Sequence, residues 1–454
     1  MIIGLLTGRI IAQSLGVESY GAFAVVWSIM QVGNFLTDGG FSVVFSSLIG
    51  EWKQHEKKEK FKKYISAAHG FRVMSYLLVI LFFIISAYIY PWSQDIREGI
   101  FFIIPFAILS TLATAFSGWW QIESNPRPQI YGELISKLSA FFGMMLLAQT
   151  NFFSVQNTMI VYGLSSGIQV MMSWFFLREF KPWRVSYDKE LWRKIWNKSW
   201  PISLMLFFTV IYFKGDTIMI EFLRPKSEVG WYGLSYRFLE IIVVVPAIFA
   251  TYMLPRLSSM WNEKREFFSQ MLLNLTIVSL LGGVSVLVVS WNLAPYIILF
   301  ISNIDFLPAS YALQPLSIAA MIIFVAQIWQ FAIIAIGKQK KLLSFFLGMA
   351  LLAPVLYFFS ITRYGYIGAA WVTVLVELIM TIVYGYILNM EKIKLFNQKT
   401  LKFILPIFII GTTSLLIGDI QGIIFFIIIT LTWIIFCKKN KYYDILTLLK
   451  YLIS

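Results

Sequence analysis

The sequence contains few charged residues for its length. Asp, Glu, Lys and Arg make up 13% of its 454 residues, against roughly a quarter in soluble domains. Hydrophobic residues make up 59%, and the mean hydropathy is +0.75. This composition leaves too little polar surface for a water-soluble fold, which excludes a soluble enzyme, a nucleic-acid-binding protein and a secreted module. It predicts an all-α integral membrane protein, in which the net charge of +14 reflects topology rather than a nucleic-acid partner.

Cysteine and histidine are also scarce. Cys437 is the single cysteine, and His55 and His69 are the two histidines, so we expect no disulfide, no metal site and no cofactor. The sequence shows no catalytic arrangement of Ser, His and Asp, and no phosphate-binding loop of the kind that ATP-hydrolysing proteins use. The predicted outer loops are too short to form the domain with which a membrane glycosyltransferase or polymerase would hold an acceptor. The sequence therefore favours a transporter over an enzyme.

Thirteen apolar stretches approach the length of about 20 residues with which a helix crosses ~30 Å of hydrocarbon. The predicted spans are 20–50, 65–90, 99–120, 130–150, 156–178, 199–222, 230–256, 267–290, 309–335, 342–361, 366–390, 402–418 and 421–437. The opening segment, 1–15, has a helical pattern but would rise only about 22 Å. It is either a shortened first span or the end of a span that begins upstream. With it, we predict about fourteen transmembrane helices.

Positive charges alternate between the predicted loops. Twenty-eight of the 37 Lys and Arg residues lie in one alternate set of loops, and four lie in the other set. By the positive-inside rule the first set is cytoplasmic. We therefore predict a multi-pass membrane protein whose C-terminus lies in the cytoplasm.

An internal repeat divides the chain into two halves. The segment LGVESYGAF near the start corresponds to PKSEVGWYGL from residue 225, and a long span and a basic loop follow each of them. Both copies have the same sidedness, as in two-lobed transporters that rock about a central cavity. We predict two pseudo-symmetric six-helix lobes, 1–190 and 199–390, around such a cavity. Residues 391–454 would add two helices and a basic cytoplasmic tail.

Several ordered segments resemble one protein family. They are RIIAQSLGVESYGAFAVVWSIMQVGNFLTDGGF, SGWWQIESNPRP, GDTIMIEFLRPKSEVGWYGLSYRFLE with the following MLPRLSSM, and YGYIGAAWVTVLVEL. Together they resemble the Wzx-type O-antigen and capsule flippases of the multidrug/oligosaccharidyl-lipid/polysaccharide exporter superfamily. The resemblance covers roughly 1–390. Ile122 stands where the family usually has a glycine, and the first span is shorter than usual.

The resemblance implies a function in polysaccharide biosynthesis. It suggests that the chain carries undecaprenyl-diphosphate-linked oligosaccharide from the cytoplasmic to the outer leaflet, for assembly of lipopolysaccharide O antigen, capsule or exopolysaccharide. The implied partners are an H⁺ or Na⁺ gradient, a polysaccharide polymerase and a chain-length regulator. The alternatives are a cation-coupled multidrug exporter and a lipid II flippase of the same superfamily. A membrane glycosyltransferase or polymerase is the third hypothesis.

Five basic residues lie within predicted spans, at two depths. Arg72 and Lys137 lie about 10–12 Å from the cytoplasmic side, and Arg9, Lys214 and Arg237 about 9–12 Å from the outer side. Each side chain taken singly can snorkel to its nearer interface. Together the five would form two cationic tiers in one cavity, since Arg and Lys suit a travelling diphosphate.

Four acidic residues also lie within predicted spans, and they are candidates for ion coupling: Asp38, Asp216, Glu240 and Glu377. Glu240 is three residues from Arg237 on one helix face, where the two charges would neutralise each other. Asp216 and Lys214 point to different faces of their helix and are less suited to pairing. Asp38 and Glu377 would bind a proton or Na⁺, or would serve as structural partners of buried cations.

Overall fold

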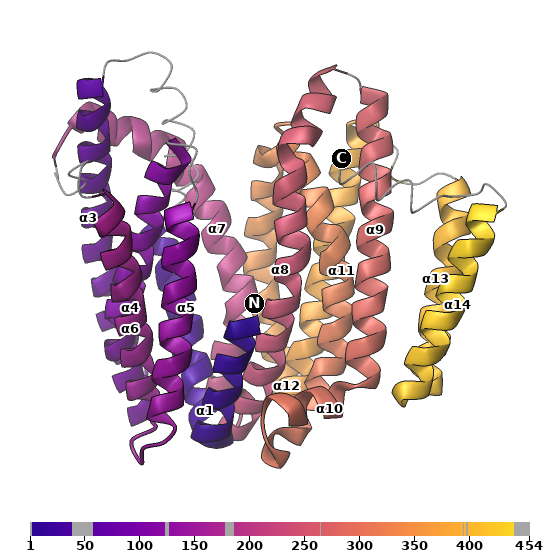
Figure 1. Cartoon of the computed structure of the whole chain (residues 1–454), viewed down its shortest axis with the longest axis horizontal. Helices are drawn as coiled ribbons and strands as arrows, with labels where there is room; N and C mark the ends of the chain where they lie inside the picture. Colours follow the sequence, from indigo (N-terminus) through magenta and orange to yellow (C-terminus); the bar gives the residue numbers. More distant parts are fainter. Residues whose placement is uncertain are drawn as a thin grey trace. The chain divides into compact units, whose positions relative to one another are not determined.

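The computed structural model describes residues 2–38, 58–122, 127–177, 186–263, 265–393, 395 and 398–439, and this part of the chain is helical without any strand. Its helices are α1 (Ile2–Asp38), α3 (Lys58–Tyr88), α4 (Gln94–Ile122), α5 (Arg127–Leu147), α6 (Val155–Leu177), α7 (Lys189–Leu223), α8 (Lys226–Glu263), α9 (Arg265–Asn292), α10 (Ala294–Ile301), α11 (Ser310–Ala335), α12 (Leu342–Met390), α13 (Gln398–Ile417) and α14 (Asp419–Lys439), with 3₁₀ turns η2 (Ile304–Ala309) and η3 (Gln339–Lys341) (Figure 1). Eight stretches within the described residues are long and apolar enough to cross a membrane, and two shorter apolar helices accompany them. The chain is therefore an all-α, multi-pass membrane protein, as predicted.

Two of the long helices break at an internal glycine. α12 has 49 residues, and an unbroken helix of that length would measure about 74 Å, far more than a bilayer is thick. It breaks at Gly365, whose φ of 60° and ψ of −149° are not helical. α1 breaks in the same way at Gly16, with φ of 73°. Glycine adopts these angles without a Cβ clash. With both breaks counted, the described residues form thirteen helices of 20 or more residues and the short helix before Gly16, which agrees with the prediction of about fourteen that includes a shortened first span.

Two sharp helical hairpins depend on glycines that let the paired helices approach closely. At the break in α12, a Cβ on Gly368 would lie only 2.5 Å from the carbonyl oxygen of Ser360 on the preceding half. Between α13 and α14, a Cβ on Gly422 would lie 2.3 Å from the carbonyl oxygen of Ser414. In each hairpin the small residue lets two helix ends approach closely around a turn with positive φ.

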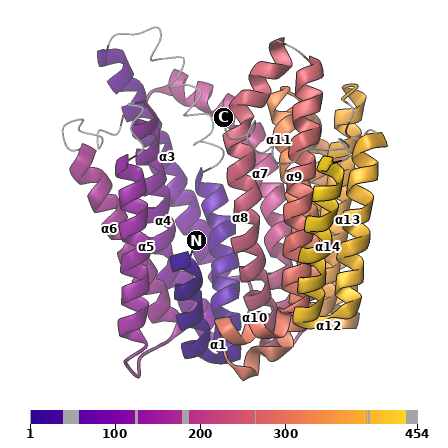
Figure 2. The same cartoon turned by 45° about the vertical axis from the view of Figure 1, so that its right-hand side comes forward.

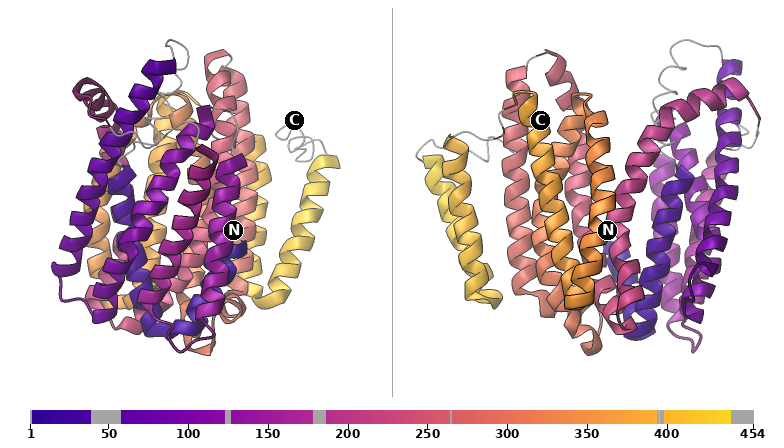
Figure 3. Two further views of the ribbon diagram at one scale, coloured as in Figure 1. Left: turned by 60° about the vertical axis from the view of Figure 1, so that its left-hand side comes forward. Right: turned by 180° about the vertical axis from the view of Figure 1, so that it is seen from behind.

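The chain forms two compact units. Unit 1 contains residues 1–233, 301–305 and 346–358, and unit 2 contains the remainder. In unit 1, α6 packs against α4 and α5, and α1 packs against α3, α4 and α7 (Figures 1 and 3). In unit 2, α9 packs against α11, and the paired helices α13 and α14 pack against α9 (Figure 2). We inferred the lobes 1–190 and 199–390 from the sequence repeat. They stay a prediction, because a division into compact units does not test whether the two halves arose by duplication.

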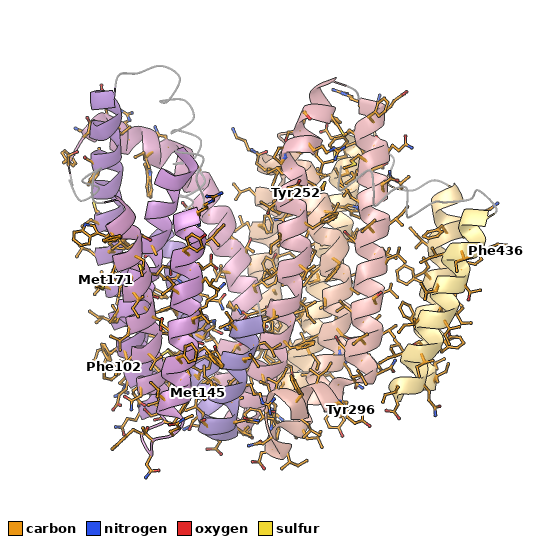
Figure 4. The ribbon with its side chains drawn as sticks, viewed as in Figure 1. Phe102, Met145, Met171, Tyr252, Tyr296 and Phe436 are labelled. Atoms are coloured by element: carbon orange, nitrogen blue, oxygen red, sulfur yellow. The ribbon has the colours of Figure 1, made fainter. Side chains whose placement is uncertain are left out.

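The outer faces of both units carry large apolar side chains. Phe102, Met145 and Met171 project from unit 1, and Tyr252 and Tyr296 from unit 2 (Figure 4). Their exposed fractions range from 41% for Phe102 to 72% for Tyr252. Such a surface suits hydrocarbon rather than water, because apolar side chains can contact lipid tails without the free-energy cost of exposure to water.

Candidate functional site

Lys214 is deeply buried in unit 1. It lies in α7, and 6% of it is exposed. The helix that carries it begins well before the apolar stretch, because the Asp188 side chain caps it by accepting a hydrogen bond from the Leu191 backbone N–H at 3.1 Å. A lysine this far from solvent in a membrane protein needs compensating partners, and it is a candidate for function by default.

Asp216 is completely buried close to Lys214. Its Oδ1 accepts hydrogen bonds from the backbone N–H of Thr217 at 2.6 Å and from the Thr217 hydroxyl at 3.2 Å. Its Oδ2 accepts a hydrogen bond from the Tyr232 hydroxyl of α8 at 2.5 Å. Lys214 also attracts this carboxylate electrostatically. The two residues are thus close enough to attract each other, and the expectation that they are less suited to direct pairing stays a prediction.

The remaining predicted cations lie in different surroundings. Arg237 of α8 bonds Glu240 at 3.1 Å, which confirms the pairing expected from their spacing. Lys137 of α5 is half-exposed and bonds Glu133, one turn away, at 2.6 Å; the sequence analysis did not consider this pair. Arg9 is half-buried in the first half of α1.

Two predicted site residues have side chains outside the described part of the structure. Arg72 lies within α3, and Asp38 is the last residue of α1. Their roles stay predictions, as does the arrangement of the five basic residues in two tiers. The aromatic pair Trp119 and Trp120, near the end of α4, likewise falls outside the described side chains.

Tyr232 lies in PKSEVGWYGL, the segment that we predict to repeat LGVESYGAF, in which Tyr20 has the corresponding position. Both tyrosines are almost fully buried. The two copies meet around them: a Cβ on Gly230 would lie 2.1 Å from the carbonyl oxygen of Val17, and one on Gly233 would lie 2.6 Å from Cβ of Ala24. Small residues thus allow the repeated segments of α1 and α8 to cross at close range. The sequence analysis identified the repeat but missed Tyr232 as a partner of Asp216.

An aromatic cluster fills the middle of unit 1. The ring of Trp27 on α1 lies 5.1 Å from that of Tyr162 on α6 and 5.6 Å from that of Phe106 on α4. Phe23, one turn before Trp27, stacks on it at 5.8 Å. These separations are typical of aromatic pairs that stabilise a packed core. The cluster joins α1, α4 and α6, and it lies on the part of α1 that follows Tyr20 in the chain.

Glu377 lies in the second half of α12, in unit 2. It is 5% exposed, and the described residues include no hydrogen-bond or ion-pair partner for its carboxyl group. In this it differs from Asp216 and Glu240, whose carboxylates are both engaged.

A second charged group lies outside the spans of unit 2. Glu391, just after α12, accepts hydrogen bonds or ion pairs from Lys341 at 2.9 Å and Lys338 at 3.2 Å. The Lys341 hydrogen bond holds the pKa of this carboxyl below its usual range, although partial burial opposes the shift. The ion pairs of Glu391 with Lys338 and Lys341 therefore connect the segment before α12 with the segment after it.

The chemistry that these groups support is electrostatic. Among the described residues there is no group of three or more His, Cys, Asp or Glu that could hold a metal ion. The described side chains pair carboxylates with cations and hydroxyls. Buried charges of this kind in membrane helices are typical of transport pathways.

Comparison with known proteins gives a consistent picture. A sequence family described as polysaccharide biosynthesis protein matches residues 1–261. No curated sequence matches the chain. Among solved structures, one described as lipid II flippase MurJ in an inward closed conformation is 17% identical, covers 97% of each chain and has a TM-score of 0.73. At this identity the likeness concerns the fold alone.

Two further structures share the fold. An inward-facing multidrug resistance MATE family transporter of the MOP superfamily is 14% identical over 86% of this chain and 94% of its own, with a TM-score of 0.72. A MOP superfamily transporter from Pyrococcus furiosus, described as having a binding pocket of reverse polarity, is 15% identical over 86% and 91%, with a TM-score of 0.61. The fold is that of flippases and exporters with different cargo.

Proposed function

Because the chain belongs to the polysaccharide biosynthesis protein family, we propose that it carries undecaprenyl-diphosphate-linked oligosaccharide from the cytoplasmic to the outer leaflet of the bacterial inner membrane. The observation that carries this proposal is the family match over more than half of the chain. The product would be O antigen, capsule or exopolysaccharide, assembled with a polymerase and a chain-length regulator. Transport would be driven by an H⁺ or Na⁺ gradient.

The buried cations support a diphosphate as the travelling group. Lys214 is withdrawn from solvent, and a lysine offers a mobile point charge to phosphate oxygens. Arg237 and Arg9, which are partly exposed, would add bidentate contacts from the outer side. Arg72 and Lys137 would supply the cytoplasmic tier. In this account the lobes 1–190 and 199–390 alternate their access about the cavity, and 391–454 is an appended pair of helices with a cytoplasmic tail.

A lipid II flippase is the second candidate, favoured by the similarity to the MurJ structure over 97% of both chains. Its cargo carries the same lipid diphosphate, so the basic residues do not separate the two. A multidrug exporter would need a cavity suited to cationic drugs, and buried Lys214 argues against it. The sugar is therefore the feature that an experiment must distinguish.

Deletion of the gene in its host tests the proposal directly. We expect surface polysaccharide to disappear while lipid-linked oligosaccharide accumulates in the inner leaflet, and the intact chain to restore export. Cell-wall synthesis should continue, because lipid II would not be the cargo. Arrested cell-wall synthesis with lipid II accumulation would instead support the second candidate and contradict the first.

A further inference from the structure

Glu377 is isolated among apolar helices. Beyond the first turn of α9, throughout α11 and in the second half of α12, it is the one residue of the types Asp, Glu, Lys, Arg and His. The part of α8 that belongs to unit 2 contributes Arg237, Glu240, Arg256 and Glu263. Arg237 and Glu240 pair at 3.1 Å, and Arg256 and Glu263 lie in the last two turns of the helix. Within α9 beyond its first turn, α11 and the second half of α12, no other residue of these types can offset an ionised Glu377.

The position of Glu377 makes escape to an interface impossible. It lies 12 residues after the break at Gly365 and 13 before the helix end at Met390, about 18 and 20 Å at 1.5 Å per residue. A glutamate side chain is too short to snorkel over such distances, unlike Lys or Arg. Placement of an ionised carboxylate there would be costly, so the carboxyl group is neutral in this buried position.

The helix face around Glu377 carries hydroxyl groups that are occupied elsewhere. Thr381 donates to the backbone carbonyl of Glu377 at 2.7 Å, and Thr373 donates to that of Ala369 at 3.1 Å. Tyr384, two turns along and buried, is close enough for its phenol to interact electrostatically with the carboxyl group. It is the ionisable group that faces Glu377 from its own helix.

Neighbouring helices add no charge near this face. Gly385 of α12 packs against the ring of Trp329 on α11, where a Cβ would lie 3.0 Å from Cζ3. Trp329 in turn donates its indole N–H to Thr276 of α9 at 2.9 Å. Both contacts satisfy polar groups or fill space without an ionisable partner.

Glu377 can gain or lose a proton without breaking any hydrogen bond that the structure describes. Asp216 differs, since a proton on it would disrupt the bonds from Tyr232 and Thr217. Glu240 differs too, since a proton would break its pair with Arg237. The charge of Glu377 therefore depends mainly on whether water reaches its carboxyl group.

We propose that Glu377 is the proton-binding site that couples transport to the proton gradient, an inference that rests on the proposed transport function. The O–H bond is the one bond that changes. When unit 2 opens to one side, the hydrated carboxyl group releases its proton to water, and it takes a proton from water on the other side. The carboxyl group crosses the closed, apolar state in its neutral form and thereby carries the proton from one side to the other. It makes the opposite crossing ionised, only together with the cargo, and this couples the two movements.

Chemical labelling tests the site independently of cargo. Dicyclohexylcarbodiimide adds to protonated carboxyl groups in apolar surroundings without a leaving group, and peptide mass spectrometry identifies the adduct. In the purified full chain we expect Glu377 to be labelled, at a rate that falls about tenfold per pH unit once the group is mostly ionised. Glu240 should remain largely unlabelled. Absence of label on Glu377 at both acid and alkaline pH would overturn the proposal, as would protection from labelling by Na⁺ at constant pH.

Transport measurements separate coupling from a structural role. Glu377→Gln mimics the neutral form and should keep the thermal unfolding temperature, but export of polysaccharide to the cell surface should fall and lose its sensitivity to a protonophore. Glu377→Asp should retain part of the activity. Thr381→Val, one turn away, is the matched control and should leave labelling of Glu377 intact. Wild-type export by Glu377→Gln would overturn the proposal, whereas failure of the wild-type chain to export polysaccharide would overturn the proposed function and leave the labelling result standing.

Discussion

At the scale of single residues, Asp216 depends on a tyrosine from another helix. Tyr232→Phe removes the hydrogen bond to Oδ2 and leaves a buried carboxylate oxygen without that donor. We expect the free energy of unfolding to fall by about 1–3 kcal/mol, the usual effect of an unsatisfied buried group. Thermal or denaturant unfolding in detergent measures the change.

A double-mutant cycle with Asp216→Asn is the control for this prediction. Because the hydroxyl acts through the carboxylate, Tyr232→Phe should cost less in the Asp216→Asn background than in the wild type. Equal costs in the two backgrounds would contradict the assigned interaction.

The site was only partly predictable from the sequence. The Arg237–Glu240 pair follows from i, i+3 spacing, and the pairing is confirmed. The partnership of Asp216 with Tyr232 was not foreseen, because it joins two helices across a turn and no periodicity within one helix reveals it. The signal was present in the repeat, since Tyr232 occupies the same place as Tyr20 before a glycine.

At the scale of elements, glycines decide where helices may approach. Gly368→Ala would place a Cβ 2.5 Å from a backbone oxygen at the hairpin in α12, whereas Gly348 in the same helix has nothing within 4 Å. We expect Gly368→Ala to lower stability and membrane yield. Gly348→Ala should be neutral or stabilising by up to about 1 kcal/mol, because alanine favours helix. The unfolding temperatures and yields of the two variants provide the comparison, and equal behaviour would contradict the hairpin geometry.

The loops around α12 should respond to pH through Glu391. Its pKa is held below the usual range by Lys341, so its pairs stabilise the fold above the unfolded-state pKa. This contribution is lost as the pH falls through the lower, folded-state pKa. The difference in unfolding temperature between the wild type and Glu391→Gln should therefore be greatest at neutral pH and shrink on acidification. A difference independent of pH would show that the ion pairs do not contribute.

The length of the apolar stretches predicts most of the helices, but it does not predict the residues at which they begin and end. The spans 342–361 and 366–390 were predicted as separate, and the break at Gly365 separates them. α7 begins at Lys189, ten residues before the predicted span, because the capped, charged first turns are helical but not apolar. The short α10 and η2 were missed for the opposite reason: they are too short for a hydropathy window to separate.

At the scale of the whole molecule, the uneven distribution of positive charge predicts the topology. Reporter fusions after Glu56, Lys189 and Lys394 should report the cytoplasm, and fusions after Gln94 and Ser227 the outer side. A reversed pair of neighbouring loops would contradict the predicted number and orientation of spans.

The central claim is that the chain moves a lipid-linked diphosphate sugar between leaflets, and leaflet accessibility in reconstituted vesicles tests it most directly. Purified protein in vesicles with undecaprenyl-diphosphate-linked oligosaccharide should bring the sugar within reach of an external glycosidase when a proton gradient is imposed, without ATP. Lys214→Gln should slow the initial rate about ten- to hundredfold, since a hydrogen bond to a charged group contributes about 1.5–3 kcal/mol, while exposed Lys226→Gln should not. Sugar that stays protected with the wild-type protein under every gradient, or equal rates in the two lysine variants, would contradict the account.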